Sequence, residues 1–155
     1  MGFGLELAFN RCSPEVLLEI TLQHTGGARF VAEARKHRLV IDQPAEDGAT
    51  DHGMSPSEML LVSLGSCIGQ FVAQYLSMRG LSSDGLQVSV AAERTTRPLR
   101  LSGFRVEVIA PGLSDRQLRG LEKTLATAGL VHGAIARENT VRITAGTARA
   151  SGEAE

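Results

Sequence analysis

Three short segments near the start of the chain concentrate β-branched and aliphatic residues, a pattern typical of β-strands. They cover residues 16–24, 29–34 and 38–41. Gly26-Gly27 separates the first two segments and Lys36-His37 separates the next two. The polar stretch 42–53, which contains a proline and two glycines, predicts a loop after the third strand.

The strongest local signal is the capping box Ser55-Pro56-Ser57-Glu58. Serine at the N-cap, proline at the first helical position and glutamate at the third are typical of a helix start. The apolar pattern then continues to Gly80, which we expect to end the helix. A helix of about 25 residues is about 37 Å long, which is long for a domain of this size.

The second half of the chain predicts three more strands and one more helix. Alternating apolar and polar residues predict strands at 86–93 and 101–109, joined by a hairpin turn at 95–98. Ser114-Asp115 caps a second helix that extends to about Ala128. A short turn at 131–136 leads to a last strand at 140–144.

The predicted order is therefore β-β-β-α-β-β-α-β. Strands that do not alternate singly with helices exclude a doubly wound parallel sheet. We predict an α+β fold with mainly antiparallel strands and a long central helix. The length of 155 residues fits a single domain, which we place at 1–145, followed by a small, polar and flexible tail at 146–155.

Composition narrows the classes of partner. A formal net charge of −1 provides no general attraction to nucleic acid or to an anionic membrane. The most apolar stretch, Met59 to Ile68, is shorter than the roughly 20 apolar residues of a membrane span. We therefore expect neither nucleic acid nor a membrane as a partner.

The first residues lack the pattern of a signal peptide, and the two cysteines, Cys12 and Cys67, do not form a disulfide scaffold. Free thiols suggest a reducing environment, so we expect a cytoplasmic protein. Three of the histidines, His24, His37 and His52, show no metal-ligand spacing with one another or with Cys67. We expect no metal and no cofactor.

A helical wheel with about 100° per residue places Leu64, Cys67, Phe71 and Tyr75 on one face of the long helix. Small residues on the other side, such as Gly65 and Gly69, would let another helix approach closely. A helix that is apolar over most of its circumference must be buried over most of it. A small domain cannot easily cover it alone, so we predict a homodimer. Cys67 itself either acts as a small hydrophobic residue of the core or carries the chemistry of the protein.

Residues around this helix resemble the OsmC/Ohr family (osmotically inducible protein C and organic hydroperoxide resistance). Ser55-Pro-Ser-Glu-Met-Leu-Leu-Val-Ser-Leu-Gly-Ser-Cys67 is similar to the segment that precedes the family's reactive cysteine. Residues 37–44, the loop to Gly53 and Val131-His132 also look like the OsmC-like branch, and the similarity runs from about 26 to 145.

The resemblance implies an intertwined homodimer with the long helices in the centre and the sheets wrapped around them. It also implies a thiol peroxidase, in which a thiolate attacks an organic hydroperoxide and becomes a sulfenic acid. A second cysteine of the family then forms a disulfide, which a small dithiol such as a lipoyl group reduces. An arginine and a glutamate hold the thiolate ready.

Two residues are candidates to act with Cys67. The nucleophile is the thiolate, which needs a nearby cation. Gly26-Gly27-Ala28-Arg29 looks like the family's Gly-Gly-Arg turn, so Arg29 is the candidate cation, with a solvated surface arginine as the alternative. His132 could approach the thiol, and the alternative is a capping or surface histidine.

The chain departs from the family pattern at two positions. The second cysteine would fall near Gly129, where there is none, and the other thiol, Cys12, lies far upstream. The family's glutamate aligns with Ser57 rather than with Glu58. On the wheel Ser57 lies about 80° from Cys67 and Glu58 about 180°, so Glu58 is better explained by the capping box.

Three hypotheses follow. The first is a one-cysteine thiol peroxidase in which an external thiol or dithiol reduces oxidised Cys67. The second is a non-catalytic member of the family that binds a small apolar ligand at the dimer interface, beside Leu64, Phe71 and Tyr75. The third is a structural or stress-associated dimer with an inert Cys67.

Overall fold

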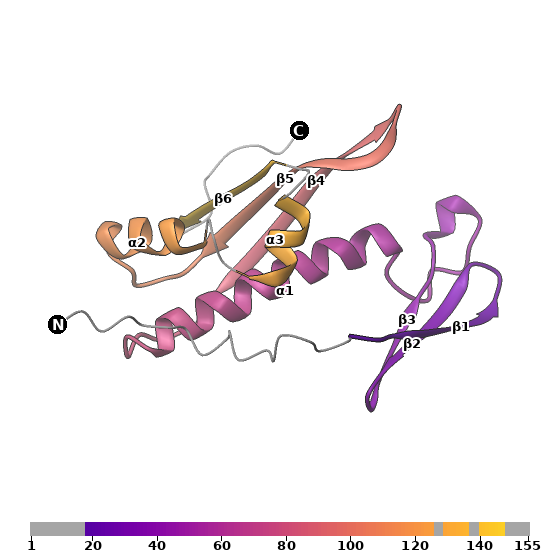
Figure 1. The fold of residues 1–155 in the computed structure, drawn as a ribbon, viewed down its shortest axis with the longest axis horizontal. Helices are drawn as coiled ribbons and strands as arrows, with labels where there is room; N and C mark the ends of the chain where they lie inside the picture. The colour runs from indigo at the N-terminus through magenta and orange to yellow at the C-terminus, as the bar shows by residue number, and fades with distance from the viewer. Residues whose placement is uncertain (1–17, 126–128, 137–139, 148–155) are drawn as a thin grey trace. The chain divides into compact units, whose positions relative to one another are not determined.

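The computed structural model describes residues 18–125, 129–136 and 140–147. The chain divides into two compact units, Met1–Ser55 and Pro56–Glu155. Figure 1 shows the strands β1 to β3 of the first unit and the elements α1 to β6 of the second. Each unit is described by itself below. The prediction of one domain at 1–145 stays a prediction.

The first unit is a three-stranded antiparallel sheet in the order β1-β2-β3. Its strands are β1 (Thr21–Gly26), β2 (Arg29–Ala34) and β3 (His37–Ile41). Gly26 and Gly27 have φ of 116° and 57°, conformations that favour glycine and allow the tight turn between β1 and β2. The first strand starts later than predicted, at Thr21, and residues 16 and 17 lie outside the described residues.

One face of this sheet is apolar and largely uncovered within the unit. Leu22, Ala32 and Leu39 are cross-strand partners and share that face. Ala32 is buried between its neighbours, whereas Leu22 and Leu39 are 53% and 43% exposed. A single three-stranded sheet has no second layer of its own to cover such side chains. The unit therefore has little apolar core.

The segment after β3 folds back on the sheet instead of forming an open loop. It contains a short 3-10 helix, η2 (Ala45–Asp47), and Ile41 forms a parallel bridge with Met54. The N–H of Asp42 donates to the carbonyl of Met54 at 3.2 Å. A Cβ on Gly53 would overlap the carbonyl of Val40, so glycine is required for this close approach.

The second unit begins with helix α1 (Pro56–Ser77), which starts directly after Ser55 as the capping box predicts. Its 22 residues are slightly fewer than predicted. Gly80, at φ 65°, donates to Ser77, and Leu81 donates to the carbonyl of Leu76. These bonds form a Schellman-type end with glycine at the left-handed position. The prediction that Gly80 ends the helix is confirmed.

A second three-stranded sheet has the order β4-β5-β6. Its strands are β4 (Gln87–Thr96), β5 (Leu99–Ile109) and β6 (Val141–Gly146). β4 and β5 form an antiparallel hairpin, whereas β6 runs parallel to β5. A parallel return requires a long connection, and the intervening helices provide it. β6 includes Gly146, the first residue of the predicted tail, and residues 148–155 lie outside the described part of the chain.

Two helices form the connection between β5 and β6. The first, α2 (Asp115–Leu125), was predicted to reach Ala128, and residues 126–128 lie outside the described residues. The second, α3 (Leu130–Ala136), occupies the segment predicted as a short turn. The carboxylate of Glu122 accepts a hydrogen bond from the N–H of Ala145 at 2.9 Å, at the outer edge of β6.

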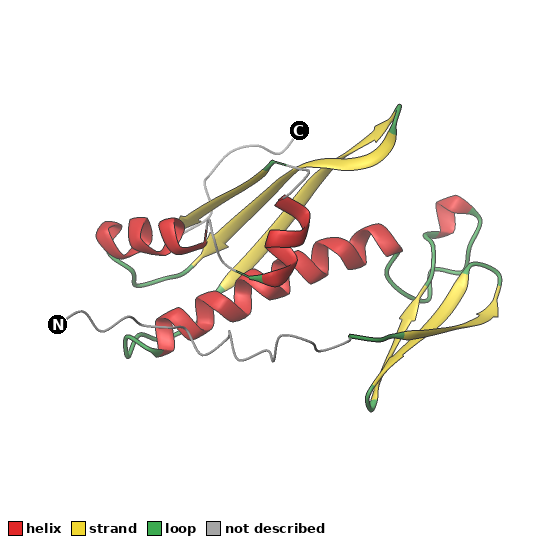
Figure 2. Cartoon of the chain, viewed as in Figure 1, coloured by secondary structure: helices red, strands yellow, loops and turns green. Residues whose placement is uncertain are grey.

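The core of the second unit lies between α1 and the sheet, with α2 and α3 packed against the same helix. Figure 2 shows α1 running along the sheet. A Cβ on Gly65 would lie 2.9 Å from Val90 and one on Gly69 would lie 3.4 Å from Val88. The small residues of α1 thus accommodate strand β4 within this unit, and the approach of another helix from a second copy stays a prediction. Buried apolar side chains of this core include Leu64, Ile68, Val72, Leu76, Phe104, Val106, Val108, Leu121 and Leu125.

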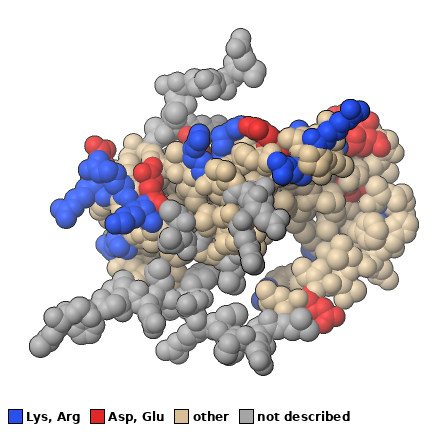
Figure 3. Space-filling model, turned by 45° about the horizontal axis from the view of Figure 1, so that its top comes forward, with Lys and Arg blue, Asp and Glu red and all other residues tan. Residues whose placement is uncertain are grey.

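By length and composition alone α1 could cross a membrane, since an 18-residue window has a mean hydropathy of 1.5. The core helix of a soluble protein meets the same test, and α1 packs along β4. In the space-filling view acidic and basic side chains are intermixed over the visible face (Figure 3), in line with a net charge of −1.

Candidate functional site

Cys67 lies in the middle of α1 and is partly exposed, with a free thiol. Its neighbours on the same helix face, Leu64, Phe71 and Tyr75, are buried. The thiol is therefore set among core residues without being sealed from solvent. A cysteine that acted only as a small core hydrophobe would be fully enclosed, so this position is compatible with chemistry at the sulfur.

Gly129, which is 62 positions later in the chain than Cys67, lies directly against the sulfur. A Cβ built on Gly129 would be 2.6 Å from Cys67 Sγ. Gly129 precedes α3 and has a φ of 90°, and its carbonyl accepts from the N–H of Gly133 at 3.0 Å. The position at which the family resemblance places a second cysteine is thus held by a glycine, and a side chain there would meet the sulfur.

His132 lies on α3, one helical turn after Gly129, and is buried. Because α3 packs against α1, the helix that carries His132 is next to the helix that carries Cys67. The interpretation of His132 as a surface histidine is wrong. Its action on the thiol stays a prediction.

Ser57 and Glu58 are exposed in the first turn of α1. They precede Cys67 by nine or ten residues, which corresponds to about 13–15 Å along the helix axis. Neither side chain can therefore contact the sulfur of its own chain directly. A role for either residue at the site requires an intermediary such as an arginine, as the family resemblance implies.

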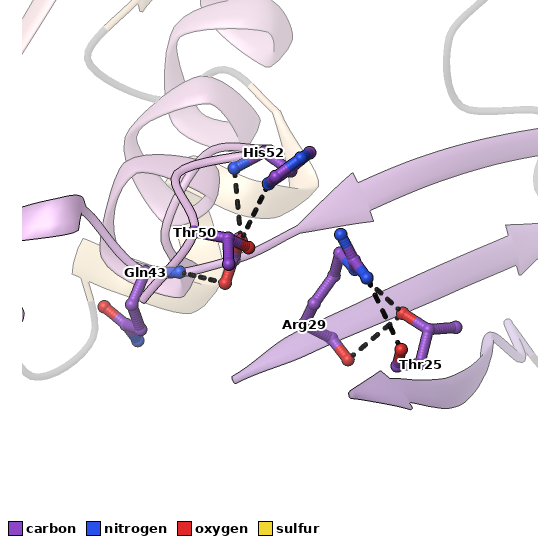
Figure 4. A network of polar contacts seen from close by, with 6 residues as sticks. Thr25, Arg29, Gln43, Thr50 and His52 are labelled. Carbon is purple, nitrogen blue, oxygen red and sulfur yellow. Dashed lines mark hydrogen bonds and ion pairs between the residues drawn. The ribbon is translucent and has the colours of Figure 1, made fainter. Parts of the chain in front are cut away.

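Arg29 is the first residue of β2 and is half-buried, so it is not a fully solvated surface arginine. Its Nε donates to Thr25 Oγ1 at 3.3 Å and its Nη2 donates to the Thr25 carbonyl at 3.5 Å. Figure 4 shows these contacts, which hold the guanidinium against the preceding turn. Arg29 belongs to the first unit and Cys67 to the second. Their pairing stays a prediction.

Asp42 directly follows β3 and is a buried acid that no motif of the sequence identifies. Its side chain is 1% exposed. It accepts hydrogen bonds from Thr50 Oγ1 at 2.6 Å, from the N–H of Gln43 at 2.9 Å and from the N–H of His52 at 3.1 Å. The His52 ring nitrogen lies 3.9 Å from the same carboxylate. These contacts gather the loop around one charge (Figure 4).

The hydrogen bond from Thr50 and then that from the His52 backbone lower the pKa of Asp42 from 3.8 to about 2. Burial opposes the shift, while Gln43 and the charge of Arg29 add smaller effects in the same direction. Asp42 is enclosed by its own loop rather than by a thick layer of protein, so the hydrogen bonds outweigh desolvation. An aspartate at the end of a strand, followed by a polar loop, was the sequence signal for this network.

A buried amide lies on the same side of α1 as the thiol. Gln74 follows Cys67 by seven residues, which is about two helical turns. Its Oε1 atom is buried and has no hydrogen-bond partner among the described residues. An unpaired buried acceptor is unfavourable, so this part of α1 is open to a further donor.

An open groove of about 310 Å³ lies on the other side of α1, between the helix and β4. It is lined by Leu61, Val62, Gly65, Ser66, Val88 and Val90. The second hypothesis placed an apolar pocket beside Leu64, Phe71 and Tyr75, but these three side chains are buried in the core. The structure therefore gives no support to a ligand pocket at those residues.

The comparison with protein families decides the classification. The model of the family described as OsmC-like protein matches residues 48–144, more than half of the chain. The chain belongs to the OsmC-like family. The match includes Cys67, Gly129 and His132, whereas Arg29 lies before it. No curated protein sequence matches the chain.

Solved structures show the OsmC-like fold. An OsmC-like protein from Mycoplasma pneumoniae matches with a TM-score of 0.73 at 13% identity, over 85% of this chain and 97% of its own. A hypothetical protein from Aquifex aeolicus matches with a TM-score of 0.72 at 18% identity, over 85% and 96%. The organic hydroperoxide resistance protein OhrB of Bacillus subtilis has a TM-score of 0.61 at 14% identity, over 84% and 100%. The predicted α+β fold and order of elements are confirmed, with α3 as an additional short helix between α2 and β6.

Proposed function

We propose that this OsmC-like protein serves in the response to oxidative stress by reducing organic hydroperoxides with Cys67. The observation that carries the proposal is the position of Cys67, the cysteine of the family-like motif, on α1 with a partly exposed free thiol. The similarity to a structure described as an organic hydroperoxide resistance protein supports the same chemistry.

In the proposed first step the Cys67 thiolate attacks the terminal oxygen of the hydroperoxide. An S–O bond forms, the O–O bond breaks, and the alkoxide that leaves takes up a proton from solvent. The sulfur is oxidised by two electrons to a sulfenic acid and the hydroperoxide is reduced to an alcohol. The partial exposure of Cys67 allows the substrate to reach the sulfur.

The second step uses an external thiol, because Gly129 offers no sulfur where it contacts Cys67. The thiolate attacks the sulfenic sulfur, an S–S bond forms and the S–O bond breaks, and the hydroxide that leaves takes up a proton from solvent to become water. The product is a mixed disulfide. A second thiol, or the second sulfur of a small dithiol, then releases the reduced Cys67 as a new disulfide is made. Cys12, the other thiol of the chain, lies outside the described residues.

The remaining candidate residues have supporting parts in this proposal. Arg29 would supply the cation that stabilises the Cys67 thiolate, with Ser57 in the place of the family's orienting glutamate and Glu58 capping α1. His132 would act from α3, which packs against the helix of Cys67. The half-buried guanidinium of Arg29 supports a structured role over a freely solvated one.

We also propose that the protein is a homodimer. Leu22 and Leu39 expose apolar surface on one face of the first sheet, and Leu60, Val62 and Met78 do so on α1. At roughly 25 cal/mol per Å² of apolar area, covering these faces would stabilise an association appreciably. A second copy of the chain, which presents the same faces, is the proposed partner.

The test is the consumption of cumene hydroperoxide in the presence of dithiothreitol or dihydrolipoamide, with the wild type, Cys67→Ser and Cys12→Ser compared. We expect turnover in the wild type and in Cys12→Ser, and none above background in Cys67→Ser. Equal rates in the wild type and Cys67→Ser would contradict the proposal. Loss of turnover in Cys12→Ser alone would instead assign a role to the second thiol.

A further inference from the structure

The side chain of Arg29 is held by the turn that precedes it. The hydroxyl of Thr25 donates to the carbonyl of Arg29 at 3.4 Å, and the same oxygen accepts from Arg29 Nε at 3.3 Å. Arg29 Nη2 donates to the carbonyl of Thr25 at 3.5 Å (Figure 4). Each of these bonds is long. Three of them between the same two residues nevertheless restrict the guanidinium to one side of the turn.

The turn that carries Thr25 is itself fixed on the sheet. His24 Nε2 donates to the carbonyl of Gly27 at 2.9 Å, across the turn. The ring of His24 also lies 5.2 Å from the ring of Phe30, its cross-strand partner on β2. Thr25 is therefore a firmly placed partner for the arginine rather than a residue of a free loop.

A carboxylate flanks Arg29 from the strand on the other side of β2. Phe30 pairs with Ile41 in the antiparallel ladder of β2 and β3, so the next residue of each strand brings Arg29 opposite Asp42. The charge of Arg29 is one of the causes that lower the pKa of Asp42. Three hydrogen bonds from its own loop hold the carboxylate of Asp42 in place. Thr25 thus fixes the guanidinium through direct contacts, and Asp42 attracts it at longer range.

An arginine that stabilises a thiolate gains from being held in advance. Its side chain has many rotamers, and ordering them costs free energy that a preformed set of contacts has already compensated. In the family pattern a glutamate holds the arginine, but this chain has Ser57 at that position, and a serine has no negative charge. A carboxylate for Arg29 must therefore come from elsewhere in the chain.

We infer that Thr25 and Asp42 are positioning residues of the Cys67 site, because they orient Arg29 in the way that the glutamate does in the family pattern. The inference rests on the proposed function, in which Arg29 supplies the cation for the Cys67 thiolate. Neither residue touches the reacting atoms in this assignment. Both act through the guanidinium.

The experiment measures the reactivity of Cys67 in the full chain with Cys12→Ser as the parent. Iodoacetamide alkylates the thiolate and releases iodide, and intact mass over time gives the rate. At pH 7 Arg29→Gln should react about tenfold more slowly than the parent, because less of the thiol is ionised. Thr25→Val and Asp42→Asn should each react about threefold more slowly or less rapidly still. At pH 10, where the thiol is largely ionised in every variant, these differences should shrink.

Two variants serve as matched controls. Thr25→Ser keeps the hydroxyl that bonds Arg29 and should restore the rate of the parent. Thr21→Val removes a hydroxyl from an exposed position of the same strand and should leave the rate unchanged. In the Arg29→Gln background neither Thr25→Val nor Asp42→Asn should slow the reaction further, since the group through which they act is gone.

The direction of the Asp42→Asn effect separates positioning from direct electrostatics. Removing a negative charge by itself favours the thiolate and would speed alkylation, whereas releasing Arg29 slows it. Faster alkylation or an unchanged rate in Asp42→Asn would therefore overturn the part of Asp42, and an unchanged rate in Thr25→Val would overturn that of Thr25. If Asp42→Asn does not fold, Thr25→Val alone decides, because its exposed side chain is not required for the fold.

Failure of the proposed function gives a different pattern. If Arg29→Gln itself reacted like the parent, the part of Arg29 in the proposed function would be contradicted and the inference with it. A slow Arg29→Gln with parent rates in Thr25→Val and Asp42→Asn would overturn the inference alone. A parent that reacts with iodoacetamide but consumes no cumene hydroperoxide would contradict the peroxidase activity, and the order of alkylation rates would still decide the inference.

Discussion

The two compact units of this protein are organised by different forces. In the unit Pro56–Glu155, helix α1 and strands β4 and β5 enclose a continuous set of buried aliphatic side chains. In the unit Met1–Ser55, the described residues bury one alanine, Ala32, together with the polar residues Asp42 and Ser55. The first unit is arranged around hydrogen bonds to a carboxylate, and the second around apolar packing.

The difference shows which unit depends on other surfaces for its stability. Apolar burial provides most of the favourable free energy of folding, and an isolated small sheet rarely supplies enough. Leu22 and Leu39 are exposed on the first sheet. Covering these two side chains would therefore add most to the stability of the unit. The second unit buries an apolar core of its own and exposes apolar side chains mainly on α1, at Leu60, Val62 and Met78.

The largest effect is expected in the core of the second unit. Leu64 and Leu60 are one turn apart on α1, but Leu64 is 0% exposed and Leu60 is 38% exposed. Leu64→Ala should lower the free energy of unfolding by about 2–5 kcal/mol, because it leaves a cavity. Leu60→Ala, the matched control, should cost less than about 1 kcal/mol in dilute protein. Urea unfolding measures both, and similar costs would contradict the assignment of the core.

The next effect concerns the uncovered sheet face. Leu39 and Val40 are adjacent in β3, are similarly exposed and point to opposite faces of the sheet. Leu39→Asp should weaken the proposed dimer by about tenfold or more, which is about 1.4 kcal/mol, because it places a charge on the apolar face. Val40→Asp should weaken it less. Sedimentation over a concentration series measures the dimer dissociation constants of the two variants. Equal constants would exclude the face that carries Leu39 as the dimer interface.

A smaller effect is expected at the carboxylate of the first unit. Asp42→Asn should lower the thermal midpoint at pH 7 by several degrees, since the amide cannot match the charge-assisted hydrogen bonds from Thr50 and the loop backbone. Asp47→Asn, on an exposed residue of η2, is the control and should change little.

The pH dependence follows from the lowered pKa of Asp42, about 2 in the folded protein against 3.8 as the reference value. A carboxyl group whose pKa is lower in the folded than in the unfolded protein stabilises the fold at any pH above its unfolded-state pKa. This stabilisation is lost as the pH falls through the pKa of the folded protein. The difference in thermal midpoint between the wild type and Asp42→Asn should have its full size above about pH 4 and should shrink toward pH 2. A constant difference from pH 7 to pH 2 would rule out the carboxylate charge as its cause.

The smallest effect separates two glycines of α1. Replacing a glycine by alanine within a helix gains up to about 1 kcal/mol of helix propensity. Gly69→Ala should show part of this gain, because the new Cβ would lie 3.4 Å from Val88. Gly65→Ala should lose it, because its Cβ would lie 2.9 Å from Val90. If both variants were stabilised in thermal unfolding, the close contact between α1 and β4 would be contradicted.

Local signals were sufficient for much of the fold. The capping box at Ser55-Pro56 and the glycine at Gly80 identify both ends of α1, since each acts through backbone groups within one turn. The alternation of Phe104, Val106 and Val108 identifies the buried face of β5. Signals of this kind depend on neighbours in sequence, and for that reason they can be interpreted without the structure.

Features that depend on distant residues could not be predicted in this way. The contact of Gly129 with Cys67 joins segments that are 62 positions apart, and nothing local to either residue indicates it. The parallel pairing of β6 with β5 and the contact of Gly65 with Val90 are equally non-local. The sequence predicts only a turn at 131–136, where the structure has α3, because the short apolar pattern does not reach the length at which a helix is distinct.

The hydrogen bond from the N–H of Ala145 to the carboxylate of Glu122 has a consequence for the protein at high concentration. β6 is an edge strand of its sheet, and the free N–H groups of an edge strand are a template to which a strand of another chain can add. Glu122 takes up one of these donors and places a negative charge at the edge. The same contact that fastens α2 to β6 thus also opposes the addition of another strand at this edge.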